Sequence, residues 1–313
     1  MLGSLCVVTQ SFTIIGRNTE LIDIKTIVQI VNSINISWVA AVSPGFEDLT
    51  FEQARCLTGV VPENVSETLP PAPHLFGNEE DIWPMGAPTS YDIRRRYSGC
   101  GGSIRNQGEC GSCWAFAATS ALADRLCIYS SETVRVILSP QQLVSCDSSS
   151  RGCEGGYISE AWKYMRSTGT VTEDCYAYKS GSSRSTGECY LSNKECPSSS
   201  YVKPEFYYPV YGAYSLSGIN KIMYEIYTKG PVETALYVYE DFYAYSRGVY
   251  KYTYGALIGV HAVKIMGWGV DSYSTPYWLC ANSWGTSWGS LGGYFKILRG
   301  YDECRVESYV VAG

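Results

Sequence analysis

The sequence predicts an α+β protein in which a helical lobe precedes a β-rich lobe. Two segments indicate this order. Residues 112–129 are apolar over a length that suits a buried helix, and residues 230–269 contain runs of β-branched and aromatic residues typical of strands. The chain has 313 residues, of which 45% are hydrophobic, so it can bury a substantial core. Intrinsic disorder is therefore excluded as the overall state.

Charge and hydropathy exclude two classes of partner. The chain has 24 basic and 30 acidic residues and a net charge of -6, which disfavours a surface for nucleic acid or anionic membranes. The longest apolar region, residues 27–42, is interrupted by five polar side chains and cannot serve as a membrane span. We expect no nucleic-acid partner and no membrane span.

The cysteine content indicates the compartment. Thirteen cysteines are too many for a reducing cytosol unless they bind metal, and only His74 and His261 are available as zinc co-ligands. The sequence thus predicts a protein of the secretory pathway with disulfides and an odd thiol.

The first part of the chain predicts a leader and two helices. Residues 1–16 carry no charge and include a short apolar stretch, but lack a basic start, so we expect a weak signal peptide. Thr50 and Gln53 form a capping-box pattern that starts a second, short helix. The first helix is predicted by apolar residues spaced along one face, which needs a packing partner: Ile24, Ile27, Val28 and Val31.

A proline-rich stretch then predicts a boundary. Residues 69–74 contain three prolines, which favour extended backbone and exclude helix, so we place a linker and a boundary within residues 70–86. Asn35 and Asn64 begin N-glycosylation sequons before this boundary, and whether they are used is left open.

The most informative motif is Gln107-Gly108-Glu109-Cys110-Gly111-Ser112-Cys113-Trp114. Its second cysteine stands where a glycine-rich turn enters the apolar helix, and a helix N-terminus lowers the pKa of a thiol. Cys110 and Cys113 can also be read as a redox pair or as half of a zinc site. Neither alternative is favoured, because a zinc site needs a second close pair and the other cysteines are spread singly.

The motif C-G-S-C-W resembles the local signature of the papain-like cysteine proteases, in which a histidine and an asparagine follow far downstream. His261 and the stretch Asn282-Ser283-Trp284-Gly285 match that pattern. The resemblance is closest to the cathepsin B group. It extends to the segment before the motif, which resembles a propeptide, to residues 87–92, which resemble a mature start, and to residues 300–313.

The resemblance implies a papain-like two-lobed fold with the active-site cleft between a helical left lobe, roughly residues 100–208, and a β-rich right lobe, roughly residues 209–313. It divides the chain into a signal peptide at 1–16, a propeptide at 17–85 and a catalytic domain at 86–313. It further implies a monomer that needs no metal or organic cofactor.

The same resemblance assigns catalytic roles. Cys113 would be the nucleophile, a thiolate stabilised by the imidazolium of His261 and by the helix terminus. Asn282 would orient the histidine ring, and Gln107 would donate its side-chain amide to the oxyanion beside the backbone N–H of Cys113.

The resemblance also assigns substrate-binding residues. Trp284 would shield the hydrogen bond between histidine and asparagine, and Gly155 and Gly156 would let a substrate backbone approach closely. Glu307 would lie at the end of the pocket for the side chain two residues before the cleaved bond, with Ala235 and Ala262 on its wall. We therefore expect this pocket to accept arginine as well as apolar side chains.

Cysteine pairing is likewise implied by the resemblance. The implied bridges are Cys100 with Cys127, Cys110 with Cys153, Cys146 with Cys189, and Cys175 with Cys196. The last two of these are the least secure, because sequence alone allows three pairings of four cysteines. Cys280 and Cys304 are expected to be buried thiols, and Cys6 and Cys56 lie in the removable part.

One departure from cathepsin B concerns the occluding loop, which offers paired histidines to a substrate's terminal carboxylate in that group. The matching region, residues 175–196, is shorter and has no histidine. Lys179 and Arg184 are basic residues in it that could bind a carboxylate instead, but basic residues in such loops are usually solvated. We therefore expect a cysteine endopeptidase. The alternatives are a carboxydipeptidase, a non-catalytic homologue and a thiol-disulfide oxidoreductase.

The partners follow from this interpretation. We expect peptide and protein substrates, the propeptide as an intramolecular inhibitor removed more readily at acid pH, and cystatin-type inhibitors. The expected location is a lysosome-like or endosomal vacuole, or secretion.

Overall fold

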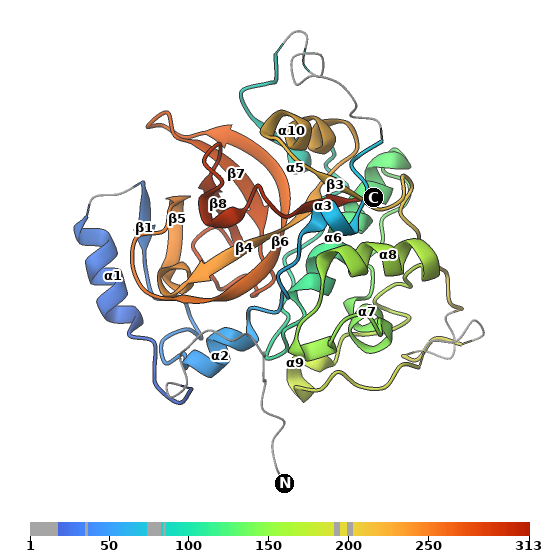
Figure 1. Cartoon of the computed structure of the whole chain (residues 1–313), viewed down its shortest axis with the longest axis horizontal. Coiled ribbons are helices and arrows are strands. Elements are labelled where there is room, and N and C mark those ends of the chain that lie inside the picture. Colours follow the sequence, from blue (N-terminus) through green and yellow to red (C-terminus); the bar gives the residue numbers. More distant parts are fainter. Residues whose placement is uncertain (1–17, 35–36, 74–82, 84–85, 191–194, 199–202) are drawn as a thin grey trace.

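The computed structural model describes residues 18–34, 37–73, 83, 86–190, 195–198 and 203–313. A helical part and a β-rich part lie side by side (Figure 1). The predicted signal peptide, the sequon at Asn35 and His74 lie outside the described residues. No helix in the described ranges has the length and apolar character needed to cross a membrane.

The helical lobe is built around α6 (Cys113–Tyr129), which is buried along most of its length because it packs against α7 (Pro140–Cys146), α8 (Ile158–Thr168) and the sheet. A helix enclosed in this way must be apolar on all sides, which explains its run of alanines and leucines. The short helices η1 (Gly152–Glu154) and α9 (Ser180–Ser183) complete this lobe.

The β-rich lobe is one twisted sheet, whose described strands follow the order β1-β5-β8-β7-β6-β4-β9-β3, with β2 paired to β6. The strands predicted within residues 230–269 are confirmed, since β4, β5 and β6 lie there. The strands are β1 (Trp38–Ala40), β2 (Tyr91–Asp92), β3 (Tyr214–Leu216), β4 (Val232–Tyr239), β5 (Tyr245–Tyr250), β6 (Leu257–Val270), β7 (Pro276–Ala281), β8 (Tyr294–Leu298) and β9 (Val310–Ala312). Between them lie α5 (Ile93–Arg96), α10 (Ile219–Thr228), η2 (Glu240–Ala244) and η3 (Glu303–Arg305).

Two buried ion pairs join α6 to the β-rich lobe. The Lys264 Nζ on β6 lies 2.5 Å from the Asp124 carboxylate, and the Arg125 guanidinium lies 2.6 Å from the carboxylate of Glu225 on α10. All four side chains are almost fully buried. Breaking such a pair leaves an uncompensated buried charge, so these contacts fix the position of α6 relative to the sheet.

Residues 22–54, here called the docking segment, pack on the β-rich lobe. α1 (Ile24–Ser33) lies against η2 and buries the face predicted from its spacing, and β1 extends the sheet by pairing antiparallel with β5 (Figure 1). α2 (Phe51–Cys56) begins with the predicted capping box of Thr50 and Gln53, which is confirmed by reciprocal hydrogen bonds of 3.1 and 2.9 Å.

Residues 57–63, here called the cleft segment, then run between the two lobes and lead to α3 (Val65–Thr68). The predicted linker is not a free connection where it is described. Its residues Pro70 and Ala72 exchange backbone hydrogen bonds of 2.8 and 3.1 Å with Ser215 on β3. The N-terminal segment therefore supplies the edge strand β1 and pairs with β3 at the other edge of the sheet.

Candidate active site

Cys113 begins α6 where the two lobes meet, and α6 packs against β6, the strand that carries His261. Cys113 is fully buried, and its Sγ accepts a hydrogen bond of 3.1 Å from the backbone N–H of Gly59 in the cleft segment. Burial raises the pKa of the Cys113 thiol to about 12, against the opposing effect of three backbone N–H groups. The thiolate expected from the sequence is therefore not the form of Cys113 while the cleft segment covers it.

His261 is oriented by Asn282. The Nε2 of His261 lies 2.7 Å from the Oδ1 of Asn282, and the same oxygen accepts a hydrogen bond of 2.8 Å from the backbone N–H of Ser283. Because an amide oxygen only accepts, Nε2 carries the proton and Nδ1 keeps its lone pair. Nδ1 is buried and finds no hydrogen-bond partner among the described residues. Burial lowers the pKa of His261 to about 4, so the ring is neutral here.

Trp284 covers this pair. Its ring centroid lies 4.7 Å from that of His261, and it stacks on Tyr243 at 5.1 Å with almost parallel planes. Only 2% of Trp284 is exposed. The indole thus keeps water from the histidine, which strengthens its hydrogen bond to Asn282.

Gln107 lies next to Ser283, the residue that follows Asn282. It is fully buried, and its Oε1 accepts a hydrogen bond of 2.8 Å from the hydroxyl of Ser283, which leaves the amide nitrogen to donate. Nε2 donates to the carbonyl of Leu57 at 3.3 Å and to that of Cys110 at 3.0 Å. The indole N–H of Trp284 also points at the Leu57 carbonyl, at 3.4 Å. A peptide carbonyl of the cleft segment therefore lies against Gln107, one of the two donors proposed for the oxyanion.

Gly156 pairs with the cleft segment as a strand would. Its N–H donates to the carbonyl of Gly59 at 2.8 Å, and its carbonyl accepts from Val61 at 2.9 Å. A side chain at Gly156 would place its Cβ 2.5 Å from the ring of Trp114. Gly155 has a φ of 112° and would direct a Cβ to 2.9 Å from the Gly59 carbonyl. Gly155 therefore needs to be glycine for the close approach of a peptide, and Gly156 needs to be glycine to pack against Trp114.

Ala235 and Ala262 face each other across β4 and β6 and share an apolar cluster with Val60 of the cleft segment. Tyr237 and Tyr309 pack against the same cluster, with ring centroids 6.5 Å apart and nearly parallel planes. Small alanine side chains leave room that Val60 occupies, and the tyrosines form an aromatic boundary.

The structure corrects the prediction for Glu307. Its carboxylate accepts hydrogen bonds from the indole N–H of Trp278 at 2.8 Å and from the backbone N–H groups of Gly300 and Asp302 at 2.6 and 2.9 Å. These donors orient it toward the turn after β8. Tyr309, two residues further along, is the side chain that packs with the alanine pocket.

Comparison with known proteins gives the family. A family model described as papain family cysteine protease matches residues 87–313, most of the chain. The chain belongs to the papain family of cysteine proteases. Cathepsin B-like CP2 of Giardia intestinalis is 35% identical over 90% of this chain and 91% of its own, and cathepsin B-like cysteine proteinase 3 of Caenorhabditis elegans is 39% identical over 92% and 82%. It is thus a cathepsin B-like cysteine proteinase.

A solved structure extends the likeness to the N-terminal part of this cathepsin B-like proteinase. Procathepsin B S9 from Trypanosoma congolense has a TM-score of 0.82 and 31% identity, over 94% of this chain and 98% of its own. Since the family model begins at residue 87, the segment before it is a propeptide region that precedes the catalytic domain.

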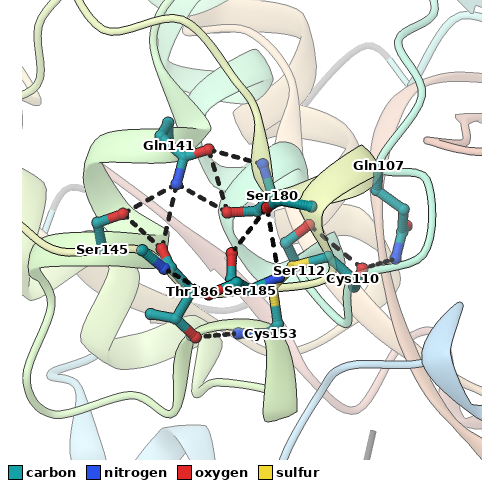
Figure 2. The surroundings of a disulfide bond; sticks show 12 residues. Gln107, Cys110, Ser112, Gln141, Ser145, Cys153, Ser180, Ser185 and Thr186 are labelled. Atoms are coloured by element: carbon teal, nitrogen blue, oxygen red, sulfur yellow. Dashed lines mark hydrogen bonds between the residues drawn. A yellow bond between two sulfur atoms is a disulfide. The ribbon is translucent and has the colours of Figure 1, made fainter. Parts of the chain in front are cut away.

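In the loop of residues 175–196, residues 175–190 lie against the helical lobe of the protease (Figure 2). The Oε1 of Gln141 accepts hydrogen bonds from the backbone N–H groups of Lys179 and Ser180 at 2.8 and 3.0 Å, and its Nε2 donates to the Ser180 hydroxyl at 2.8 Å. The backbone N–H of Glu109 donates to Gly181 at 2.9 Å. Arg184, a basic residue of this loop, forms an exposed ion pair with Glu109. The loop is thus anchored to the turn that carries Gln107 and Glu109.

Four disulfides lie in the described part of the protease, and they have the pairings that the resemblance implied: Cys100–Cys127, Cys110–Cys153, Cys146–Cys189 and Cys175–Cys196. Cys110–Cys153 joins the turn before the nucleophile to the turn before Gly155 (Figure 2). Cys280 is a buried thiol as predicted, whereas Cys304 is only half-buried, and Cys6 lies outside the described residues.

Three contributions to the site escaped the sequence. Leu57, which caps the end of α2, and Gly59 contact Gln107 and Cys113 from a segment without a periodic pattern that would reveal it. Tyr309 was missed because the direction in which its side chain faces depends on the path of the turn before β9. Ser283 could have been found, since it stands inside the Asn-Ser-Trp-Gly motif between two predicted residues.

Proposed function

We propose that this chain is the precursor of a cysteine endopeptidase that cleaves peptide bonds through Cys113, His261 and Asn282. One observation carries the proposal: a peptide already lies in the site, with the Leu57 carbonyl against Gln107 and the Gly59 N–H on the Cys113 sulfur. Residues that hold a peptide backbone in this manner suit peptide hydrolysis.

Acylation would begin once the propeptide leaves. Solvent and substrate then replace the apolar cover, so the pKa of the thiol falls, that of His261 rises, and a proton moves from Sγ to Nδ1. The thiolate attacks the carbonyl carbon of the scissile bond. The negative charge on the carbonyl oxygen is met by the Gln107 amide and the Cys113 N–H, each donor being worth roughly 3 kcal/mol of barrier. His261 then donates its Nδ1 proton to the leaving amine, and a thioester remains.

Deacylation would use the same groups in reverse. Nδ1 of His261 accepts a proton from water, and the oxygen attacks the thioester carbon. Collapse of this second intermediate expels the Cys113 thiolate and releases the new carboxylic acid. Throughout, Asn282 keeps the ring oriented through Nε2, and Trp284 limits the access of water to that bond.

The propeptide, proposed as residues 17–85, would inhibit for two reasons. The group next to Sγ is an N–H, which is not an electrophile, so the cleft segment offers the nucleophile no carbon to attack. The cover also keeps the thiol and the imidazole neutral. The disulfides suit the secretory pathway, and we propose processing in an acidic vacuole of that pathway.

Endopeptidase action is favoured by the loop of residues 175–196. It contains no histidine, and Arg184 is already paired with Glu109. A carboxydipeptidase needs a cation that captures the terminal carboxylate. Peptides with free and amidated C-termini decide between the two: equal cleavage at internal bonds supports the endopeptidase, whereas successive loss of dipeptides that amidation prevents would reverse the assignment.

The pocket of Ala235 and Ala262 should accept apolar side chains of the size of Val60, which occupies it in the precursor. With tyrosines at its boundary and Glu307 turned away, arginine has no carboxylate partner there. A library varied two residues before the cleaved bond should show valine or leucine preferred over arginine by at least about tenfold, since burying an unpaired guanidinium is unfavourable.

The decisive experiment replaces the nucleophile. The Cys113→Ala variant of the full chain should keep its fold and lose at least about ten-thousand-fold in kcat/KM after processing by added wild-type enzyme. The Cys304→Ala variant, which removes another thiol, is the matched control and should keep its activity. Turnover by Cys113→Ala within tenfold of wild type would reject the proposal.

A further inference from the structure

The start of α8 holds a carboxylate that belongs to the propeptide. The backbone N–H of Ser159 donates to Glu63 Oε1 at 2.9 Å, and the Ser159 hydroxyl donates to Glu63 Oε2 at 2.5 Å. Ser159 is completely buried beneath this contact. When the propeptide is removed, both donors lose their partner and face the emptied groove.

The catalytic domain has no substitute for Glu63 at this place. The N-cap residue of α8, Tyr157, makes no side-chain cap, so the first turn relies on the propeptide. The acidic residue in that turn, Glu160, is engaged with Lys163 at 2.7 Å. The N-terminus of an eleven-residue helix attracts negative charge through its unpaired N–H groups and dipole.

The start of α8 lies where the chain in the substrate cleft continues beyond Gly156. Val60 lies in the alanine pocket, Val61 pairs with Gly156, and Glu63 follows two residues later at α8. A substrate that pairs with Gly156 and fills the pocket would therefore continue past Ser159 with its fourth or fifth residue before the cleaved bond.

We infer that the start of α8 is a subsite of the mature enzyme for an acidic substrate side chain, which Glu63 fills in the precursor. The inference rests on the proposed peptidase function and specifies its substrate class. The ligand is a carboxylate presented four or five residues before the scissile bond, held by the N–H and hydroxyl of Ser159.

The remaining charged neighbour does not oppose this. Glu233 on β4 is fully buried and accepts a hydrogen bond of 2.8 Å from Trp162 through Oε2, while Oε1 has no partner among the described residues. Burial raises the pKa of Glu233 well above its ordinary range, and the charge of Glu63 raises it further. Because burial favours the protonated form of Glu233, its charge repulsion on an incoming carboxylate is reduced.

The test uses enzyme that the full chain produces by its own processing. Paired fluorogenic peptides carry glutamate or glutamine at the fourth or the fifth position before the bond, with valine in the pocket position. The wild type should cleave a glutamate peptide with kcat/KM about fivefold to tenfold above its glutamine twin, because two charge-assisted hydrogen bonds are gained.

Variants assign the preference to Ser159. Ser159→Ala keeps the backbone donor and should reduce the ratio to about twofold or threefold, and Ser159→Pro, which the first turn of a helix tolerates, should reduce it to about one. Ser167→Ala at the other end of α8 is the control and should leave the ratio unchanged. A wild-type ratio of one, or a ratio that persists in both Ser159 variants, overturns the subsite. Failure to cleave any peptide overturns the peptidase function instead.

A second measurement depends only on the intact precursor. Glu63→Gln should speed self-processing of the full chain by about fivefold, because the cleft segment loses a charged anchor. Glu67→Gln, four residues along on exposed α3, contacts only Asn64 at 2.7 Å and should process at the wild-type rate. Equal rates for the two variants would overturn the assignment of Glu63 even if Ser159→Pro does not fold.

Discussion

The docking segment, residues 22–54, and the cleft segment, residues 57–63, both contact the catalytic domain, but through different forces. The docking segment contributes side chains to the main core cluster: Ile22, Ile24, Ile27, Val31, Trp38, Ala40, Phe46, Leu49, Phe51 and Ala54. The cleft segment is held mainly by backbone hydrogen bonds and by the carboxylate of Glu63. Burial of apolar area depends little on pH, whereas the cover over His261 involves a group whose pKa is lowered by burial.

This difference separates anchoring from inhibition. Apolar burial keeps the propeptide attached, and the weaker polar contacts allow the cleft to open locally while the anchor stays in place. We expect the cleft segment to exchange and open first, and the docking segment to dissociate only after the chain has been cut.

The largest effect should follow from removing an anchor side chain. Trp38 is 2% exposed, packs on Tyr250 with ring centroids 5.1 Å apart, and donates to the Lys251 carbonyl at 2.9 Å. Trp38→Ala should lower the free energy of unfolding of the full-length Cys113→Ala chain by about 3 to 5 kcal/mol, as measured in urea.

The control is the next residue of the same strand. Val39 is 37% exposed, so Val39→Ala should change stability by no more than about 0.5 kcal/mol. A loss of less than about 1 kcal/mol for Trp38→Ala would show that the docking segment is not an apolar anchor.

A smaller effect is expected from pH in the cleft. The pKa of His261 is about 4 while the cleft is covered and should return to its ordinary value of about 6.5 when the cleft opens. Between these two pH values only the open state therefore binds a proton on His261. The equilibrium constant for covering the cleft falls as the pH falls from 6.5 to 4, by up to roughly a hundredfold. The measurement is amide hydrogen exchange of residues 57–63 in the full-length Cys113→Ala chain. After correction for intrinsic exchange rates, it gives the pH dependence of cleft opening.

The docking segment should show no comparable loss of protection over that range. Replacing His261 by glutamine in the same chain should remove this part of the pH dependence. A profile that is unchanged by the replacement would assign acid sensitivity to other groups and contradict the account.

The smallest effect concerns the junction between the two segments. Thr50 caps α2, which leads directly into the cleft segment, through a hydrogen bond of 3.1 Å from the Gln53 N–H. Thr50→Ala should cost about 1 kcal/mol and raise exchange in residues 51–61 about fivefold, with α1 unaffected. Equal acceleration in α1 would mean that the two segments open as one unit, which would remove the distinction between them.

Local signals in the sequence predicted much of the fold and the site. A capping box, a helix-spaced apolar face and β-forming runs each depend on neighbours within a few residues, and the structure contains each of them. A cysteine in a glycine-rich turn before an apolar helix is a local arrangement that favours a reactive thiol, whereas the role of Cys113 as nucleophile and its link to His261 and Asn282 came from the resemblance.

Contacts between distant segments could not be predicted in this way. Glu307 was expected in a pocket, but the fold of residues 300–309 directs its carboxylate to the Trp278 indole and gives the pocket to Tyr309. Such a choice depends on the path of a turn, because a shift of one residue reverses the side of a strand on which a side chain lies.

The sequence by itself determined the residue types that chemistry requires: a thiol at a helix start, a glycine where a peptide must approach, and a loop without histidine. The tertiary structure alone decided their state. Burial beneath the cleft segment makes Cys113 and His261 neutral, and the path of the propeptide brings Glu63 to Ser159 across 96 residues of sequence. The physical reason is that residue type sets which bonds a group can form, whereas desolvation and the position of partners are properties of the packed chain.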